Sequence, residues 1–254
     1  MSERSRFAAG SIVAVAVLWV VATSLTHLVS PGRFPDPVSV FAAAAQIGAG
    51  QGYAGGTIWR HIGSSVSLVL LGFAVAAATG VPLGLAMGSS RRIEAFVNPA
   101  FLLVRPIPPL AWIPLAIVWF GLGSTAKIFV VWFAAFVPAL INTYTGVRNI
   151  DPTLVAAARV HGANSAQVLR HVIVPGSLPM IFGGLRLSLQ ASWTTLVAAE
   201  LVGAVYGLGH VLTVASIDIY PGMIFYAMVW VAILGAAMTS ALAWLERSAA
   251  PWLR

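Results

Sequence analysis

Charged residues are scarce in this sequence, and cysteine is absent. Only 8% of the 254 residues are charged, against roughly a quarter in an ordinary soluble domain, while 59% are hydrophobic. This composition excludes a water-soluble globular fold. The lack of cysteine excludes disulfide bonds and thiol catalysis.

The sequence also lacks the motifs of common catalytic and ligand sites. It contains neither the Gly-x-x-x-x-Gly-Lys-Ser/Thr loop that cradles nucleotide phosphates nor a Gly-x-Ser-x-Gly nucleophile elbow. Its five histidines show no metal-ligand spacing. The formal charge of +7 comes from basic residues that form no stripe with interleaved aromatics. We therefore expect no catalytic residue, no metal site and no nucleic-acid partner.

Long apolar runs are abundant. Crossing the core of a bilayer takes roughly 20 helical residues, because only a helix or a closed barrel satisfies its backbone hydrogen bonds in lipid. The alternating pattern of a barrel is absent. We therefore predict an all-α, polytopic membrane protein of about six transmembrane helices, with the first run retained rather than cleaved as a signal peptide. The six runs are Phe7 to Gly32, Ile62 to Ser90, Pro106 to Ala126, Ile128 to Val147, Leu187 through Glu200 to Ile217, and Ile219 to Leu245.

The distribution of basic residues predicts the topology. If both termini are cytoplasmic, only Arg33, Arg60 and Lys127 fall on outer segments. Positively charged loops stay in the cytoplasm, so this asymmetry favours cytoplasmic N and C termini. The arginines that then fall inside are Arg4, Arg6, Arg91, Arg92, Arg148, Arg159, Arg170, Arg247 and Arg254.

Two further patterns concern the outer loop and the second helix. The Ala-rich stretch Val38 to Ile47 predicts a short interfacial helix, which a glycine-rich hinge follows. Gly80, Gly84 and Gly88 recur every four residues and therefore share one helix face. That face either packs tightly against another helix or forms a moving surface along a transport path.

The longest cytoplasmic segment, residues 146–176, has helix start and stop signals. Asp151 can cap a helix that begins at Pro152, and Gly162 can end it in a left-handed conformation. A second short helix then begins near Asn164 or Ser165. We expect a compact helix, glycine turn and helix whose small residues allow a partner to approach closely.

This segment resembles the EAA loop of binding-protein-dependent ABC importer permeases. The family pattern is Glu-Ala-Ala, three residues, Gly, nine residues and Ile-x-Leu-Pro, and it matches Ala157, Ala158, Gly162 and the stretch ending at Pro175. Ala156 occupies the glutamate position, which removes any ion pair made there. The resemblance runs from about Thr57 to the C-terminus and is strongest to the taurine, alkanesulfonate and nitrate branch, above all to its taurine permeases. It includes Arg105 to Gly123, Asn142 to Asp151 and Trp193 to Gly209.

The resemblance implies a type I importer fold and a non-catalytic transport subunit in the bacterial inner membrane. It implies a single permease domain over residues 1–254, made of a first helix and outer loop (1–56), core helices (57–245) and a cytoplasmic tail (246–254). A second permease copy would complete the path for a taurine-, sulfonate- or nitrate-like solute brought by a periplasmic binding protein. Two copies of an ATPase subunit would bind ATP and Mg. This chain itself would bind no cofactor, and it would contact membrane lipid. The residues expected to contact the ATPase are Ala156, Ala157, Ala158, Arg159, Gly162, Ala163 and Asn164.

Three residues are candidates for the translocation path. Glu200 is the only acid deep in an apolar run, 14 positions beyond Arg186. It is either a functional group or a structural hydrogen-bonding group inside the bundle. Arg105 lies near mid-membrane if its helix begins at Ala95, or at the interface if Pro106 to Ala126 spans alone. Trp193, like Trp112, Trp119 and Trp132, either packs between helices, lies in an interfacial aromatic belt, or helps to bind a cation.

Two other functional classes compete with an ABC permease. A self-contained channel or secondary transporter would work without an ATPase. An intramembrane hydrolase would need a nucleophile such as Ser188, Ser192 or Thr195 facing a base, and His210 lies near the outer interface.

Overall fold

The computed structural model describes residues 3–26, 30, 33–48 and 52–249. Within these ranges the chain is helical, apart from turns and one isolated bridge between Tyr53 and Gly56. The elements are α1 (Glu3–Val20), η1 (Val21–Leu25), α2 (Pro37–Gly48), α3 (Ile58–Ser89), α4 (Arg91–Val104), η2 (Pro109–Trp112), α5 (Ile113–Phe120), α6 (Ser124–Arg148), α7 (Pro152–Val160), α8 (Ser165–Val168), η3 (Leu169–Ile173), α9 (Val174–Gly203), α10 (Leu208–Ile217) and α11 (Pro221–Ala249). They form two compact units, residues 1–64 with 205–232 and residues 65–204 with 233–254.

The described part of the chain contains four helices that are long and apolar enough to cross a membrane, and five if one bent pair counts as a span. The four are Ile58–Ser89, Ser124–Arg148, Ser165–Gly203 and Pro221–Ala249. The all-α membrane fold is therefore confirmed, although the expected number of about six is approximate. The first apolar run forms α1 and η1, and its residues 27–29 and 31–32 lie outside the described ranges.

The expectation that Pro106 to Ala126 spans alone is wrong. Its helical part, Pro109–Phe120, is only about 18 Å long at 1.5 Å per residue, and it is bent by 83° from α4. Pro106 and Pro108 lack the N–H groups that would continue α4, and Gly121, with φ of +75°, ends α5. Helix α4 and the helical stretch Pro109–Phe120 together form the bent pair that could count as a fifth span.

The expectation of one span from Leu187 to Ile217 is also wrong. Helix α9 ends at Gly203, and α10 begins at Leu208. Between them Gly207 has a φ of +138°, a conformation that residues with a side chain rarely adopt. Its N–H donates to His61 Nδ1 over 3.1 Å, and His61 Nε2 in turn donates to the Tyr53 carbonyl over 3.0 Å. This buried histidine therefore holds the chain in the turn that separates the two helices.

In the unit of residues 65–204 and 233–254, helix α3 packs closely on α6. A β-carbon at Gly84 would lie 2.7 Å from the Leu140 carbonyl oxygen, and one at Gly88 would lie 2.5 Å from Val147 Cβ. The same interface carries a hydrogen bond of 3.0 Å from Trp132 Nε1 to Thr79 Oγ1. The tight-packing interpretation of the glycine stripe is confirmed.

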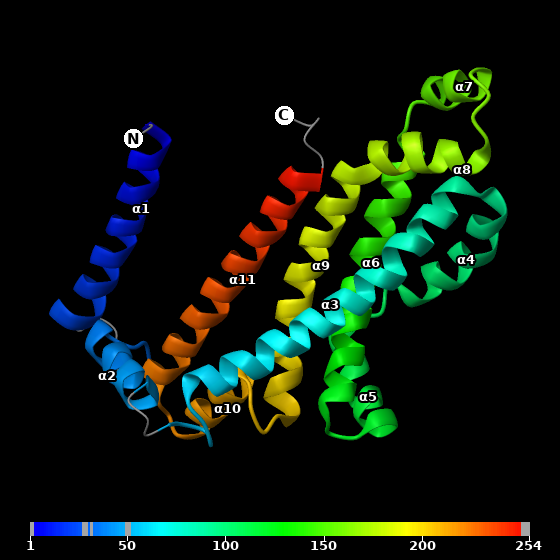
Figure 1. Cartoon of the computed structure of the whole chain (residues 1–254). Helices are drawn as coiled ribbons and strands as arrows, with labels where there is room; N and C mark the ends of the chain where they lie inside the picture. Colours follow the sequence, from blue (N-terminus) through cyan, green and yellow to red (C-terminus); the bar gives the residue numbers. More distant parts are fainter. Residues whose placement is uncertain (1–2, 27–29, 31–32, 49–51, 250–254) are drawn as a thin grey trace. The chain divides into compact units, whose positions relative to one another are not determined.

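Helices α6 and α9 form the centre of the same unit and run side by side (Figure 1). The Ser188 hydroxyl donates to the Ala135 carbonyl over 2.7 Å. At Gly184 the two backbones come so close that a β-carbon would lie 2.5 Å from Asn142 Cβ and 3.0 Å from the Pro138 carbonyl oxygen. Small residues thus permit a contact between backbones, as is usual where membrane helices associate.

One continuous helix runs from Ser165 to Gly203, through α8, η3 and α9. The chain changes direction between α8 and α9 (Figure 1). This corner coincides with the π-helical turn η3, Leu169–Ile173, which inserts wider i to i+5 hydrogen bonds into the helix.

The other unit contains α1, α2, α10 and the first parts of α3 and α11. Helix α2 confirms that the Ala-rich stretch is a short helix, and Asp36 caps it by accepting the Ser39 N–H over 3.0 Å; its interfacial position stays a prediction. The glycine-rich hinge falls partly outside the described ranges, at residues 49–51. Beyond it, the Tyr53 hydroxyl donates to Asp218 Oδ2 over 2.6 Å. Burial and this hydrogen bond raise the pKa of Tyr53 well above its ordinary value.

Candidate functional site

The segment predicted to contact an ATPase begins with a capped helix. The Asp151 carboxylate accepts the Thr153 N–H over 2.8 Å, and Pro152 occupies the first helical position of α7. The hydrogen bond from the Thr153 backbone lowers the pKa of Asp151 because it favours the charged carboxylate.

Helix α7 ends in a Schellman motif. Gly162 has a φ of +84°, as predicted. Its N–H donates to the Arg159 carbonyl over 2.9 Å, and the Ala163 N–H donates to the Ala158 carbonyl over 3.0 Å. Asn164 and Gln167 then form a reciprocal capping box that starts α8. Backbone hydrogen bonds therefore define the whole turn.

Most of the predicted contact residues lie on the surface of this turn. Ala156, Ala157, Arg159, Gly162 and Asn164 are exposed, whereas Ala158 and Ala163 are partly buried. Two apolar side chains that the sequence analysis did not single out accompany them.

These two side chains are Leu154, which is 57% exposed, and Val160, which is 86% exposed. Both belong to α7, a helix of nine residues that is set off at the α8 end of the central helices (Figure 1). Apolar side chains exposed on a helix with fixed ends are typical of a protein interaction surface.

Glu200 is buried, with only 1% of its surface exposed. The Ser65 hydroxyl of α3 lies 2.8 Å from Glu200 Oε1 and 3.0 Å from Oε2, so it can donate to either oxygen. This contact joins α3 to α9 inside the bundle. Ser65 was missed in the sequence because a single serine in an apolar run carries no recognisable signal.

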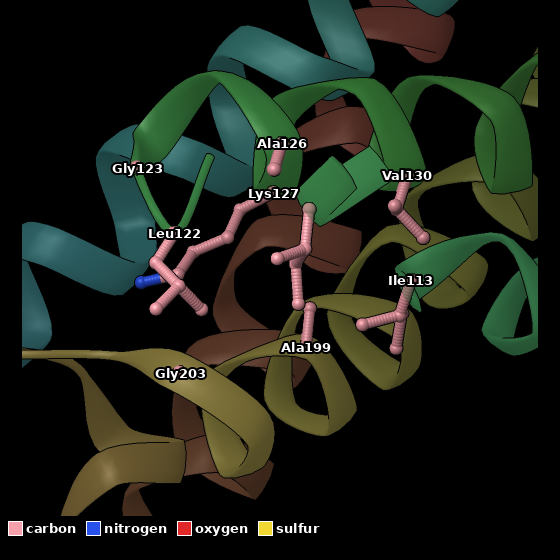
Figure 2. A pocket seen from close by; sticks show the side chains of 9 residues that line it. Ile113, Leu122, Gly123, Ala126, Lys127, Val130, Ala199 and Gly203 are labelled. Atoms are coloured by element: carbon pink, nitrogen blue, oxygen red, sulfur yellow. The ribbon is translucent and has the colours of Figure 1, made fainter. Parts of the chain in front are cut away.

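Lys127 belongs to the first turn of α6 and is half-buried. Its side chain lines a narrow pocket with residues of α5, α6 and α9 and extends toward Leu122 and away from Ile113 (Figure 2). The other lining residues are Ile117, Gly123, Ala126, Val130, Ala199 and Gly203.

The two other path candidates differ from each other in burial. Trp193 is 5% exposed, and its indole N–H has no hydrogen-bond partner among the described residues. Arg105 is exposed at the end of α4, where it borders an apolar groove that includes Phe96, Phe101 and Phe136. The structure thus places Glu200 and Trp193 inside the bundle and leaves Arg105 on its surface.

Two other candidate groups have structural contacts. Trp112 packs against Phe133 with ring centroids 4.8 Å apart, which supports the packing interpretation of that tryptophan. The Ser188 hydroxyl donates to the Ala135 carbonyl, and the Ser192 hydroxyl donates to the Ser188 carbonyl over 2.9 Å. Both hydroxyls are thus engaged with backbone groups that cannot act as general bases, which disfavours a hydrolase.

Comparison with known proteins identifies the family. The family model for the inner membrane component of binding-protein-dependent transport systems matches residues 80–254. The taurine transport system permease protein TauC of Escherichia coli (strain K12) is 37% identical over 240 residues, which cover 94% of this chain and 86% of TauC. The putative aliphatic sulfonates transport permease protein SsuC of Bacillus subtilis (strain 168) is 32% identical over 238 residues, covering 94% of this chain and 84% of SsuC.

A solved structure shows the same fold. A chain from an inward-facing crystal form of the MetNI methionine ABC transporter superposes with a TM-score of 0.64 at 22% identity, covering 75% of this chain and 96% of that chain. The expected type I importer permease fold is therefore confirmed. The chain belongs to the family of inner membrane components of binding-protein-dependent transport systems, and it is a multi-pass permease subunit of an ABC transporter.

Proposed function

We propose that this permease carries a small sulfonate, that two copies of it enclose the path, and that a separate ATPase drives transport by docking on α7 and the turn after it. The alignments with TauC and SsuC cover most of the chain, and the names of these two proteins support a sulfonate as the solute. The chain itself is then a non-catalytic subunit, and its partner binds ATP and Mg.

The main observation in support of the proposed docking site is that helix α7 is exposed and capped at its N-terminal end. Leu154 and Val160 offer apolar area, and Arg159 adds a positive charge beside them. The Schellman motif at Gly162 and the capping box at Asn164 fix this surface to the start of α8, which continues through η3 into α9. A rigid surface can transmit the closure of an ATPase dimer to a membrane helix.

The proposed topology follows from α6. Lys127 and Arg148 are 21 positions apart on this helix, or about 30 Å at 1.5 Å per residue, which is the thickness of the apolar core. With α7 in the cytoplasm, Lys127 then lies at the periplasmic end. Cytoplasmic N and C termini remain our inference from the arginine distribution.

A substitution at Gly162 tests the docking site. Gly162→Val places a β-branched residue at a φ of +84°, which disfavours this turn by roughly 1–2 kcal/mol, and we expect about a tenfold loss of ATPase co-purification and of sulfonate uptake. Gly162→Asn should largely preserve both, because asparagine tolerates this conformation better. Gly55→Val is the matched control, since Gly55 has a φ of +82° and equally open surroundings but lies outside the loop.

The measurements are pull-down of the ATPase at equal membrane abundance and uptake of labelled taurine and ethanesulfonate by proteoliposomes that contain the whole transporter and its binding protein. Full ATPase binding by Gly162→Val would exclude this turn as the docking element. Uptake without any ATPase would instead indicate a channel or secondary transporter.

A further inference from the structure

A groove lies where the start of the membrane helix α11 meets the segment before α2 and the end of α10. Its volume is about 320 Å³, which is within the range of small-molecule sites. Helix α11 packs closely on α2 beside it, since a β-carbon at Gly222 would lie 2.6 Å from the Ser39 carbonyl oxygen (Figure 1). All residues that line the groove belong to the unit of residues 1–64 and 205–232, which therefore builds the groove by itself.

Three hydrogen-bond donors line this groove without a partner. They are the guanidinium of Arg33 and the hydroxyls of Ser216 and Tyr220. In the part of the chain that the structure describes, none of these three groups makes a hydrogen bond or an ion pair. No described acidic residue lines the groove, and the nearby Asp36 and Asp218 accept other hydrogen bonds. The groove thus offers one positive charge and two hydroxyls to an anion that carries several acceptor oxygens.

The rest of the groove is an apolar strip along one face of α11. Pro221, Ile224, Phe225 and Met228 line it, and their spacing of three and four positions places them on the same side of the helix. Phe34 covers the strip from the segment before α2, with its ring centroid 5.7 Å from that of Phe225. Met228 is seven positions beyond Pro221, so the strip is about 10 Å long at 1.5 Å per residue.

The order of these groups along the groove matches the order of groups in a bilayer. Helix α11 is one of the candidate membrane spans and begins at Pro221, so its start lies near the edge of the apolar core. The three donors precede this start, and Tyr220 belongs to a residue type that is common at the membrane interface. The apolar strip follows and leads into the core. A phospholipid has the same order, because its phosphate lies at the edge and its acyl chains lie inside.

We propose that this groove binds an anionic phospholipid of the phosphatidylglycerol class. The lipid phosphate accepts hydrogen bonds from Arg33, Ser216 and Tyr220, and the first part of one acyl chain lies along the strip on α11. The groove is too small for a whole phospholipid, so the remainder of the lipid stays in the bilayer. A zwitterionic head group fits less well, because its ammonium would find no acidic partner in the lining. The inference does not depend on the identity of the solute.

Native mass spectrometry of the purified full chain in detergent tests the lipid site. The chain is titrated with phosphatidylglycerol and with phosphatidylcholine that carries the same acyl chains. We expect the first phosphatidylglycerol to bind the wild type at least fivefold more tightly than phosphatidylcholine does. Arg33→Gln should weaken phosphatidylglycerol binding about fivefold, which is the scale that one basic residue contributes near an anionic membrane surface. Arg60→Gln is the matched control, since Arg60 is also an exposed arginine of this unit but does not line the groove.

The two hydroxyls provide a second test that leaves the charge in place. The double variant Ser216→Ala, Tyr220→Phe removes both donors and keeps the ring that packs edge-on against Tyr53. We expect this variant to bind phosphatidylglycerol about threefold or more weakly than the wild type, the scale of lost hydrogen bonds. Glycerol 1-phosphate carries the phosphate without acyl chains, and it should not compete with the lipid at equal concentration.

Three results would overturn the inference. Equal affinities of the wild type for the two lipids would show that no anionic head group is recognised. An equal effect of Arg33→Gln and Arg60→Gln, together with wild-type binding by the double variant, would show general attraction to the charged surface rather than a site in the groove. Competition by glycerol 1-phosphate would show a site for a soluble phosphate instead of a lipid.

Discussion

The close contact of α6 and α9 can be tested with two neighbouring glycines. A β-carbon at Gly184 would lie 2.5 Å from Asn142 Cβ, whereas one at Gly183 would meet nothing within 4 Å. Both glycines lie inside α9, so alanine raises the intrinsic helix propensity by about 1 kcal/mol at either position. The difference in stability between Gly184→Ala and Gly183→Ala therefore isolates the steric cost of separating the two helices.

The size of that cost follows from the contacts at Gly184. Real β-carbons essentially never approach other atoms to 2.5 Å, and the obstacle includes the Pro138 carbonyl oxygen at 3.0 Å, which belongs to the backbone and cannot rotate away. Overpacking of this kind costs roughly 1–3 kcal/mol. We therefore expect Gly184→Ala to be less stable than Gly183→Ala by about 1–3 kcal/mol, with Gly183→Ala equal to or slightly more stable than the wild type.

The assay is unfolding of the purified chain in micelles with an increasing fraction of SDS, followed by tryptophan fluorescence. The nine tryptophans of the sequence supply the signal. Equal unfolding midpoints for the two variants would show that α6 and α9 are not in backbone contact at this point, and the argument from close packing would fail.

Three further predictions concern other parts of the molecule. Glu200→Gln should reduce uptake more than membrane abundance, because it removes the ionisable carboxyl group and keeps the size of the side chain and a group that hydrogen-bonds to Ser65; unchanged uptake kinetics would refute this. The purified chain alone should hydrolyse no ATP, and activity in a preparation shown by mass spectrometry to contain only this chain would contradict the assignment of catalysis to a partner. The lowered pKa of Asp151 means that its cap stabilises α7 above the ordinary carboxyl pKa and is lost as pH falls through the lowered value. ATPase binding by the wild type should therefore weaken at acidic pH, whereas Asp151→Asn, which keeps the cap without a charge, should bind with less pH dependence, and identical pH profiles would refute this.

Local signals predicted the loop geometry well. Asp151, Pro152 and Gly162 specify a helix start and stop through short-range hydrogen bonds and backbone conformation, so their effect is readable from neighbouring residues. The spacing of Gly80, Gly84 and Gly88 likewise showed which face of α3 packs closely. These features depend on little beyond the local chain.

Features that depend on distant residues were not predicted. Hydropathy alone cannot show that Gly207 turns the chain between α9 and α10, because that turn is held by His61, 146 positions away in sequence. Nor can hydropathy reveal that Ser65 meets Glu200. Hydropathy likewise does not show that Lys127, the sole lysine of the sequence, lines a pocket with residues of α5, α6 and α9.

The continuous helix through η3 has a mechanical consequence. Because hydrogen bonds continue around the corner between α8 and α9, the corner cannot swivel freely, and a rotation of the turn at Gly162 is transmitted to α9. Adding or deleting one residue in Leu169–Ile173 would turn α9 by about 100° relative to α7, since each residue advances a helix by that angle. Glu200 would then face away from Ser65. The number of residues between Gly162 and α9 therefore sets the rotational orientation of α9 relative to α7. This gives a physical reason for the fixed nine-residue interval in the loop pattern.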